Sequence, residues 1–102
     1  HSQYQLDDNE FNGSIPAGLS SCKNLALLNL AQNHLSGVLP PHLGNLSNLK
    51  VLKLQLNNLT DTFPYQFGQL RMLSTLNFSS NSLGGSIPSE IKSLSSLTML
   101  HL

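Results

Sequence analysis

A 24-residue period constrains the fold of this chain more than any other feature of its sequence. The segment LALLNLAQN, which begins at Leu25, has leucines at its first, fourth and sixth positions and an asparagine at its ninth. The same spacing recurs from Leu49 and Leu73, begins again at Leu97, and occurs in a degenerate form at His1. A fixed period of about 20–50 residues is typical of a solenoid. We therefore divide residues 1–102 into one array of repeats, at 1–24, 25–48, 49–72 and 73–96, with a partial repeat at 97–102 and no capping segments.

Stacked repeats of this kind align apolar residues that no single repeat could bury by itself. The two leucines separated by one residue (LxL) have a period of two, which predicts a short strand with one face turned inward. Strands of successive repeats should pair as a parallel sheet, with neighbours about 4.8 Å apart. A proline column follows, and proline can open a helical turn. The sequence predicts an α/β solenoid with a parallel sheet on one face and short helical or 3-10 turns on the other. The prolines are Pro16, Pro40, Pro64 and Pro88.

Another column holds only asparagine and directly follows each predicted strand. A carboxamide both donates and accepts hydrogen bonds, so a row of them can satisfy backbone groups that the turning chain leaves inside without sheet partners. Each unmet buried group would otherwise cost about 1–3 kcal/mol. We interpret this column as a structural ladder, the alternative being a polar binding row. Its members are Asn9, Asn33, Asn57 and Asn81.

The segments that begin at three of these asparagines share a further motif. They read NEFNGSIP from Asn9, NHLSGVLP from Asn33 and NSLGGSIP from Asn81. They resemble the plant-specific LxGxIP class of leucine-rich repeat, a family that includes receptor-like kinase ectodomains, receptor-like proteins and polygalacturonase-inhibiting proteins. The resemblance covers the whole chain and implies a right-handed superhelix with the sheet on its concave face and a second short strand at LxGxIP. The third repeat has Asp61 for glycine and Phe63 for isoleucine, so we expect its second strand to be irregular.

The same resemblance implies passage through the secretory pathway to the cell surface or the extracellular space. The composition is compatible with that location, because charged residues make up only 10% of the chain and the formal net charge is zero. A net charge of zero argues against a nucleic-acid partner. The apolar runs are far too short to span a membrane, so no membrane contact is expected in this segment, although its parent can be membrane-anchored. The array stops within a repeat at Leu102, and we interpret the chain as a piece of a longer protein.

No pattern in the sequence indicates catalysis, a cofactor or a metal. There is no GxSxG nucleophile motif and no GxxxxGK phosphate loop. The four histidines fall in different columns and therefore on different faces. Cys22 occupies the column of Leu46, Leu70 and Leu94, so it is interpreted as a small core residue. We expect a non-enzyme, and any kinase activity would lie outside this segment.

Four Asn-x-Ser/Thr sequons are candidates for N-glycosylation if the protein is secreted. We expect the two that lie off the LxL strands, at Asn45 and Asn58, to be the best acceptors. The sequon at Asn77 lies within a strand and should be a poorer one. The four candidates are Asn12, Asn45, Asn58 and Asn77.

The outward positions of the LxL strands are the candidate binding face. A solvated face would be polar in any case, but apolar residues here indicate contact with a partner. Lys53 is the only fixed cation of these rows and should meet an acidic group, and Asn29 and Asn77 beside it can donate or accept. The alternative is a segment that only spaces the true site. The predicted partner-binding residues are Leu27, Asn29, Val51, Lys53, Gln55, Thr75, Asn77, Ser79 and His101.

The resemblance favours the extracellular recognition module of a plant receptor-like kinase, which binds a peptide, hormone or protein partner on its concave face. A polygalacturonase-inhibiting defence protein is an alternative, although those proteins are complete short solenoids with cysteine-paired caps. A surface-adsorbing protein such as an ice binder is a third class. Such a protein needs one residue type on a regular grid, and Lys53 interrupts the row between Asn29 and Asn77.

Overall fold

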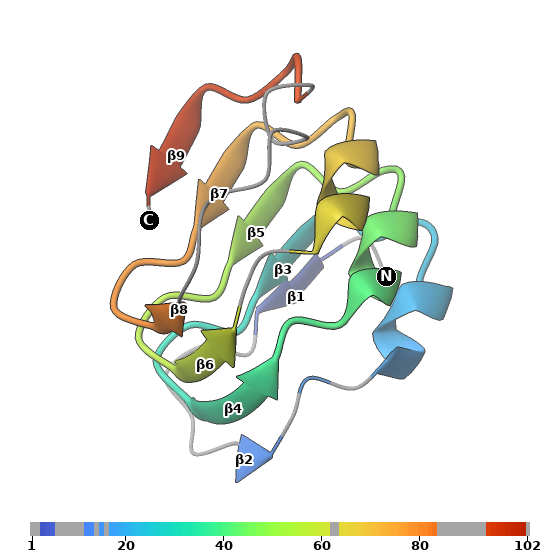
Figure 1. Cartoon of the computed structure of the whole chain (residues 1–102). Coiled ribbons are helices and arrows are strands. Elements are labelled where there is room, and N and C mark those ends of the chain that lie inside the picture. Colours follow the sequence, from blue (N-terminus) through green and yellow to red (C-terminus); the bar gives the residue numbers. More distant parts are fainter. Residues whose placement is uncertain are drawn as a thin grey trace.

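The computed structural model describes residues 3–5, 12–13, 15, 17–61, 64–83 and 94–101. Three layers run along the array: an inner sheet, a second sheet and a row of 3-10 helices (Figure 1). The inner sheet is parallel, in the order β1-β3-β5-β7-β9. Its strands are β1 (Gln3–Gln5), β3 (Leu27–Asn29), β5 (Val51–Lys53), β7 (Thr75–Asn77) and β9 (Met99–His101).

The second sheet is formed by the segments after the inner strands, and it is also parallel. Its strands are β2 (Asn12–Gly13), β4 (His34–Val38), β6 (Asn58–Asp61) and β8 (Ser82–Leu83). The 3-10 helices are η1 (Ala17–Ser21), η2 (Pro41–Asn45) and η3 (Tyr65–Gln69). Pro40 and Pro64 immediately precede η2 and η3 with extended backbone, so these prolines open the turns as predicted. The expected sheet and 3-10 turns are confirmed.

The two sheets use different registers. In the inner sheet Leu28 pairs with Leu52, an offset of one repeat, 52 − 28 = 24 residues. In the second sheet Ser36 pairs with Asn58, an offset of 58 − 36 = 22 residues. The difference of two residues keeps each side chain on the same face, because side chains alternate with a period of two. The second sheet is therefore staggered relative to the inner one without turning its apolar face outward.

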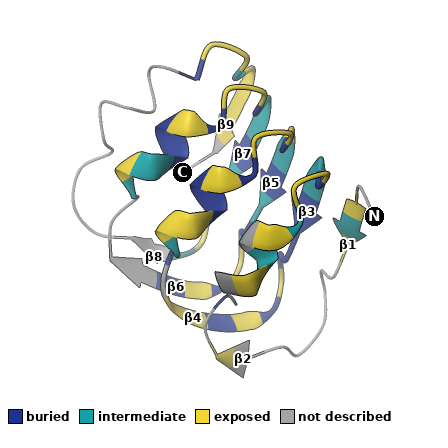
Figure 2. Ribbon diagram, turned by 90° about the vertical axis from the view of Figure 1, so that its right-hand side faces the viewer, coloured by how far each residue is buried: buried dark blue, intermediate teal, exposed yellow. Residues whose placement is uncertain are grey.

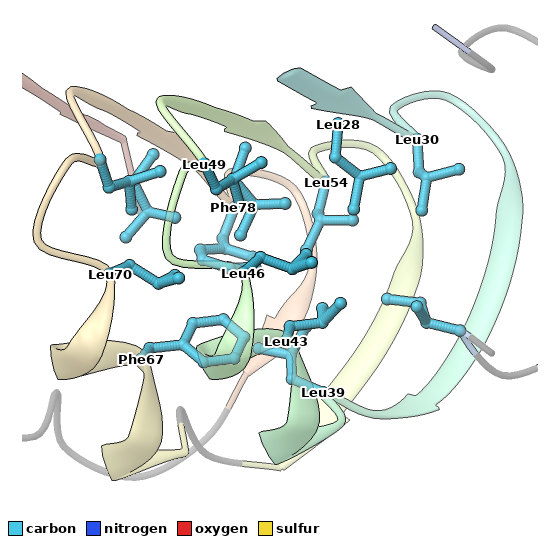
Figure 3. Packing of buried hydrophobic residues seen from close by; sticks show 14 of the residues in the cluster. Leu28, Leu30, Leu39, Leu43, Leu46, Leu49, Leu54, Phe67, Leu70 and Phe78 are labelled. Carbon is cyan, nitrogen blue, oxygen red and sulfur yellow. The ribbon is translucent and has the colours of Figure 1, made fainter. Parts of the chain in front are cut away.

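The inward leucines of successive repeats form one core between the three layers. Leu28, Leu52 and Leu76 have 0% of their surface exposed. Residues from the 3-10 helices, such as Leu43 and Phe67, point into the same cluster (Figure 3). Each fully buried leucine contributes about 1.5–3 kcal/mol. Cys22 is half-buried at the edge of this core, where its Sγ lies 3.7 Å from the Tyr4 hydroxyl and raises the pKa of that phenol.

The third repeat forms its second strand, contrary to the expected irregularity. β6 runs from Asn58 to Asp61, and Asp61 pairs with Leu83 of β8. Gly13 and Gly37, at the corresponding positions of the first two repeats, have left-handed φ angles of 82° and 84°. Asp61 is not among the described residues with positive φ, so the third repeat continues its second strand without the left-handed backbone that the glycines adopt. Phe63 lies outside the described residues.

After β3, β5 and β7 the chain turns through a residue with left-handed backbone. Gln32, Leu56 and Ser80, at equivalent positions of three repeats, have φ angles of 56°, 61° and 60°. This conformation costs a non-glycine residue roughly 1–2 kcal/mol. It turns the backbone sharply toward the second sheet and brings the ladder asparagine, the next residue in each repeat, into the interior.

Glycine also permits close contact between two 3-10 helices. Gly44 of η2 is buried, and a Cβ at this position would collide with the carbonyl oxygen of Gln66 in η3. The neighbouring helices can approach this closely only because residue 44 has no side chain.

Candidate ligand-binding face

The outer surface of the inner sheet, here called the concave face, consists of the outward residues of β1, β3, β5, β7 and β9 and of the described positions just after these strands. In β5 and β7 the central leucine is buried and its two neighbours are half-buried (Figure 2). Leu28 is buried at the centre of β3, whereas Leu100 at the centre of β9 is 41% exposed. Parallel strands lie about 4.8 Å apart, so equivalent residues of successive repeats form rows across the sheet. These rows contain the residues that the sequence identified as candidates for partner binding.

Most of the candidates lie half-buried on this face, each with part of its side chain accessible. This group comprises Leu27, Val51, Lys53, Gln55, Thr75, Asn77 and Ser79. Asn29 differs from them, because only 9% of its surface is exposed. His101 contributes backbone to β9, and its side chain lies outside the described residues. Two apolar residues on or beside this face, Met99 and Leu56, are 51% and 46% exposed.

Two asparagines of the central row are engaged in local turns. Asn29 Oδ1 accepts a hydrogen bond from the backbone N–H of Ala31 at 3.2 Å. Asn77 Oδ1 accepts both the N–H of Ser79, at 3.1 Å, and its hydroxyl, at 2.9 Å. These carbonyl oxygens are occupied, which revises the expectation that both asparagines freely donate and accept beside Lys53. Asn29 presents little surface, whereas Asn77 is half-buried and keeps part of its side chain accessible.

Lys53 interrupts this row of turns and supplies a charge. Among the described residues of the concave face it is the only lysine or arginine, and it is half-buried in the central strand β5. Val51 precedes it on the same strand and on the same face, and Leu27 lies beside Val51 in the register of β3 and β5. The arrangement places one cation next to an apolar pair, and it suits a ligand with an acidic group and a neighbouring apolar side chain.

Gln55, two residues after Lys53, has an unusual environment. Its side chain is half-buried, and its Oε1 atom is shielded from solvent with no hydrogen-bond partner among the described residues. Its own backbone carbonyl accepts bonds from the N–H of Gln32 at 3.0 Å and from Asn57 Nδ2 at 3.3 Å. The backbone is therefore fixed, while the side-chain oxygen lacks the partner that buried acceptors normally have.

The asparagine ladder lies behind this face and is directed into the interior. Asn57 Nδ2 donates to the carbonyls of Leu30 and Leu54, at 3.0 and 3.1 Å, and its Oδ1 accepts the N–H of Leu35 at 3.1 Å. Asn81 repeats this pattern one repeat later, with Nδ2 donating to Leu54 O at 2.8 Å and Oδ1 accepting the N–H of Leu59 at 3.0 Å. These carboxamides join consecutive repeats through backbone groups that have left the sheet.

The remaining ladder residues follow the same scheme as far as the structure describes them. Asn33 is buried, and its Nδ2 donates to the carbonyls of Leu30 and Ala31 at 2.9 and 3.1 Å. Asn9 lies outside the described residues. Because the described amides bond inward, the ladder offers a ligand little, and the binding candidates are the outward rows.

The sequons occupy different faces of the molecule. Asn45 is exposed at the end of η2. Asn58 is also exposed, but it lies at the start of β6 in the second sheet and not in a loop. Asn77 is half-buried in β7, on the concave face. Asn12 belongs to β2, and its side chain lies outside the described residues.

Among the described residues, no three histidine, cysteine, aspartate or glutamate side chains come together as metal ligands would. No helix in the same part of the chain has the length and apolar character needed to cross a membrane.

Comparison with known proteins identifies the class to which this chain belongs. The family model described as leucine rich repeat matches residues 23–83 and 47–102, so the two matches together span residues 23–102. The chain belongs to the leucine-rich repeat family. No curated protein sequence matches it.

Solved structures extend this assignment to plant receptor ectodomains. The chain superposes on PEPR1, solved with AtPEP1, with a TM-score of 0.97 and 40% identity over 99% of this chain and 14% of that one. The ectodomain of the Arabidopsis receptor kinase HAESA, solved with an IDA peptide hormone, gives a TM-score of 0.92 and 42% identity. This match covers 96% of this chain and 17% of the HAESA chain. The BIR3–SERK2 complex from Arabidopsis thaliana gives a TM-score of 0.90 and 37% identity. This match covers 94% of this chain and 52% of the matched chain. The repeats thus resemble those of plant receptor kinase ectodomains, and the chain spans a small part of the larger receptors it matches.

Proposed function

We propose that this chain is an extracellular recognition segment of a plant leucine-rich repeat receptor kinase and that it binds a peptide, hormone or protein partner on its concave face. Any kinase activity belongs to other parts of such a protein, and this segment acts by binding. Support comes from similar structures that were solved as complexes, PEPR1 with AtPEP1 and HAESA with an IDA peptide hormone ligand. BIR3 and SERK2 were solved as a complex of two proteins, which supports a protein such as a co-receptor as the second kind of partner that we propose.

The single observation that carries the proposal is the half-buried Lys53 at the centre of the concave face, flanked by the apolar Val51 and Leu27. Five strands span four gaps of about 4.8 Å, or roughly 19 Å, which accommodates about six residues of an extended peptide. We propose that Lys53 binds an acidic side chain or a carboxyl terminus, while Val51 and Leu27 contact apolar groups. An ammonium ion confers this preference because it donates up to three hydrogen bonds and carries a full positive charge.

Charge reversal at Lys53 tests the proposal. Random linear peptides are selected for binding to the wild-type chain, and the affinity of the enriched peptides is measured by calorimetry. We expect enrichment of aspartate and glutamate and, with Lys53→Glu, a loss of affinity of about tenfold or more, equivalent to about 1.4 kcal/mol per factor of ten. The effect should weaken as salt is added, because exposed charges are screened.

Arg71→Glu provides the matched control. Arg71 is exposed in the turn after η3, outside the concave rows, and the substitution makes the same change in net charge. It should leave peptide affinity nearly unchanged. The proposal is wrong if no peptide binds, if Lys53→Glu binds as well as wild type, or if both variants lose affinity equally.

We also propose that N-linked glycans occupy Asn45 and Asn58 and leave the concave face open. Both residues are exposed and belong to η2 and to the second sheet, whereas Asn77 is half-buried on the concave face with Oδ1 bonded to Ser79. In protein secreted from plant or insect cells, peptide mapping should show high occupancy at Asn45 and Asn58 and low occupancy at Asn77. Full occupancy at Asn77 with Asn45 empty would contradict this assignment.

A further inference from the structure

Gln55 occupies a position where the concave face departs from the pattern of its neighbouring repeats. In the repeats on either side, the backbone N–H of Ala31 and that of Ser79 donate to the asparagine carboxamide two residues earlier. In the repeat of Gln55 that earlier residue is Lys53, which has no carboxamide. The backbone N–H of Gln55 therefore lacks the side-chain acceptor that its two neighbours have.

The side chain of Gln55 adds an unpaired acceptor at the same place. Its Oε1 is shielded from solvent and has no partner among the described residues, although the side chain as a whole is half-exposed. Among the described residues Oε1 has no hydrogen bond to lose when the side chain moves outward, so little opposes its use by a ligand.

We propose that Gln55 is a specificity-determining residue that binds an amide of the ligand, either from the peptide backbone or from an asparagine or glutamine side chain. The ligand N–H donates to Gln55 Oε1, and the ligand carbonyl accepts from the amide nitrogen of Gln55. This inference rests on the proposed function, because it adds a second contact to the face that carries Lys53. Two residues along a strand span about 7 Å, so the bound amide lies within about that distance of the acidic group held by Lys53.

A residue of this kind has a thermodynamic signature that a structural residue does not share. An unpaired buried acceptor destabilises the free protein, so an apolar side chain of similar length should stabilise the fold. The same replacement removes the contact with the ligand and should weaken binding. Opposite effects on stability and on affinity are expected where function maintains a residue that folding does not need.

The experiment compares Gln55→Met with wild type in thermal unfolding and in binding of the peptides selected on the wild-type chain. We expect Gln55→Met to raise the Tm by about 4 °C or more, given the usual sensitivity of a domain of this size. We expect its affinity for those peptides to fall about tenfold, as for the loss of hydrogen bonds to a desolvated group. Gln69→Met is the matched control, because Gln69 is exposed on η3, and neither quantity should change.

The outcomes separate this inference from the proposed function. Peptides that depend on Lys53 but bind Gln55→Met as tightly as wild type would overturn the role of Gln55 and leave the concave binding face intact. A Tm that is unchanged or lowered by Gln55→Met would also overturn it, because the unpaired acceptor would then not destabilise the free protein. If no peptide binds the wild-type chain, the proposed function fails, and this inference fails with it.

Discussion

Replacement of Asn57 by leucine is expected to lower the free energy of unfolding by about 3 kcal/mol. Asn57 is 6% exposed, and its carboxamide joins two repeats through bonds to Leu30, Leu54 and Leu35. The carbonyls of Leu30 and Leu54 each keep a second donor, from Asn33 and Asn81. The N–H of Leu35 is bonded to Asn57 Oδ1, and it would remain in the interior without that acceptor. Urea unfolding monitored by circular dichroism measures the loss.

The pH dependence of the stability of the Asn57→Asp variant tests the same hydrogen bonds. Its carboxyl keeps an acceptor for the N–H of Leu35, but at neutral pH a carboxylate faces the carbonyl oxygens of Leu30 and Leu54. Burial and these dipoles raise the pKa of the introduced carboxyl in the folded state above its unfolded value of about 3.9. The folded state then binds the proton more tightly, so the variant is most stable below about pH 4 and loses stability as pH rises through the folded pKa.

Asn48→Leu serves as the control for both variants. Asn48 is exposed, and its side chain donates one hydrogen bond, to the carbonyl oxygen of Lys23 at 3.0 Å. Its replacement should therefore change the free energy of unfolding by about 0.5 kcal/mol or less. If Asn57→Leu were no more destabilising than Asn48→Leu, the ladder would not hold the repeats together. If the stability of Asn57→Asp relative to wild type did not change with pH, the same conclusion would follow, that the ladder does not hold the repeats together.

Phe67→Ala is expected to cost about 3–5 kcal/mol. Phe67 is 0% exposed and points from η3 into the leucine core, where its ring lies 6.3 Å from that of Phe78 at an angle of 30° (Figure 3). The loss combines the transfer of apolar surface to water with the cavity that the ring leaves between neighbouring repeats. Thermal and urea unfolding of the variant would measure the combined loss.

Tyr65 offers a matched aromatic on the same 3-10 helix. It is 64% exposed, so Tyr65→Ala should change stability by only about 0.5 kcal/mol. Equal losses for the two variants would mean that helix propensity, and not core packing, determines the effect at Phe67. That result would contradict a single core shared by the sheets and the 3-10 helices.

The 24-residue period made the inner sheet predictable because every repeat contributes the same short strand at the same phase. Leu28 and Leu52 pair as the period requires, and both are fully buried. The 22-residue register of the second sheet could not be predicted from the 24-residue period, because this stagger arises from how the repeats pack. The left-handed backbone at Gln32, Leu56 and Ser80 was equally hidden, because these side chains have no property in common.

The candidate site was predictable in outline and not in its details. Alternation along the strands identified the outward positions, but it could not distinguish Asn29, which is buried beside Ala31, from the more accessible Asn77. That difference depends on local turns and on neighbouring repeats. The unpaired Oε1 of Gln55 likewise depends on three-dimensional surroundings that a column of Ala31, Gln55 and Ser79 does not reveal.

The most direct measurement of the binding face is chemical-shift mapping of a selected peptide on the isotopically labelled chain. The account predicts that the largest shifts fall on the concave face, at Val51, Lys53, Gln55 and Asn77, and that they disappear with Lys53→Glu but persist with Arg71→Glu. Residues of η2 and η3 should shift little, since these helices lie on the opposite side of the core (Figure 1). Shifts centred on the 3-10 helices or on β4 and β6, with the inner strands unaffected, would contradict it.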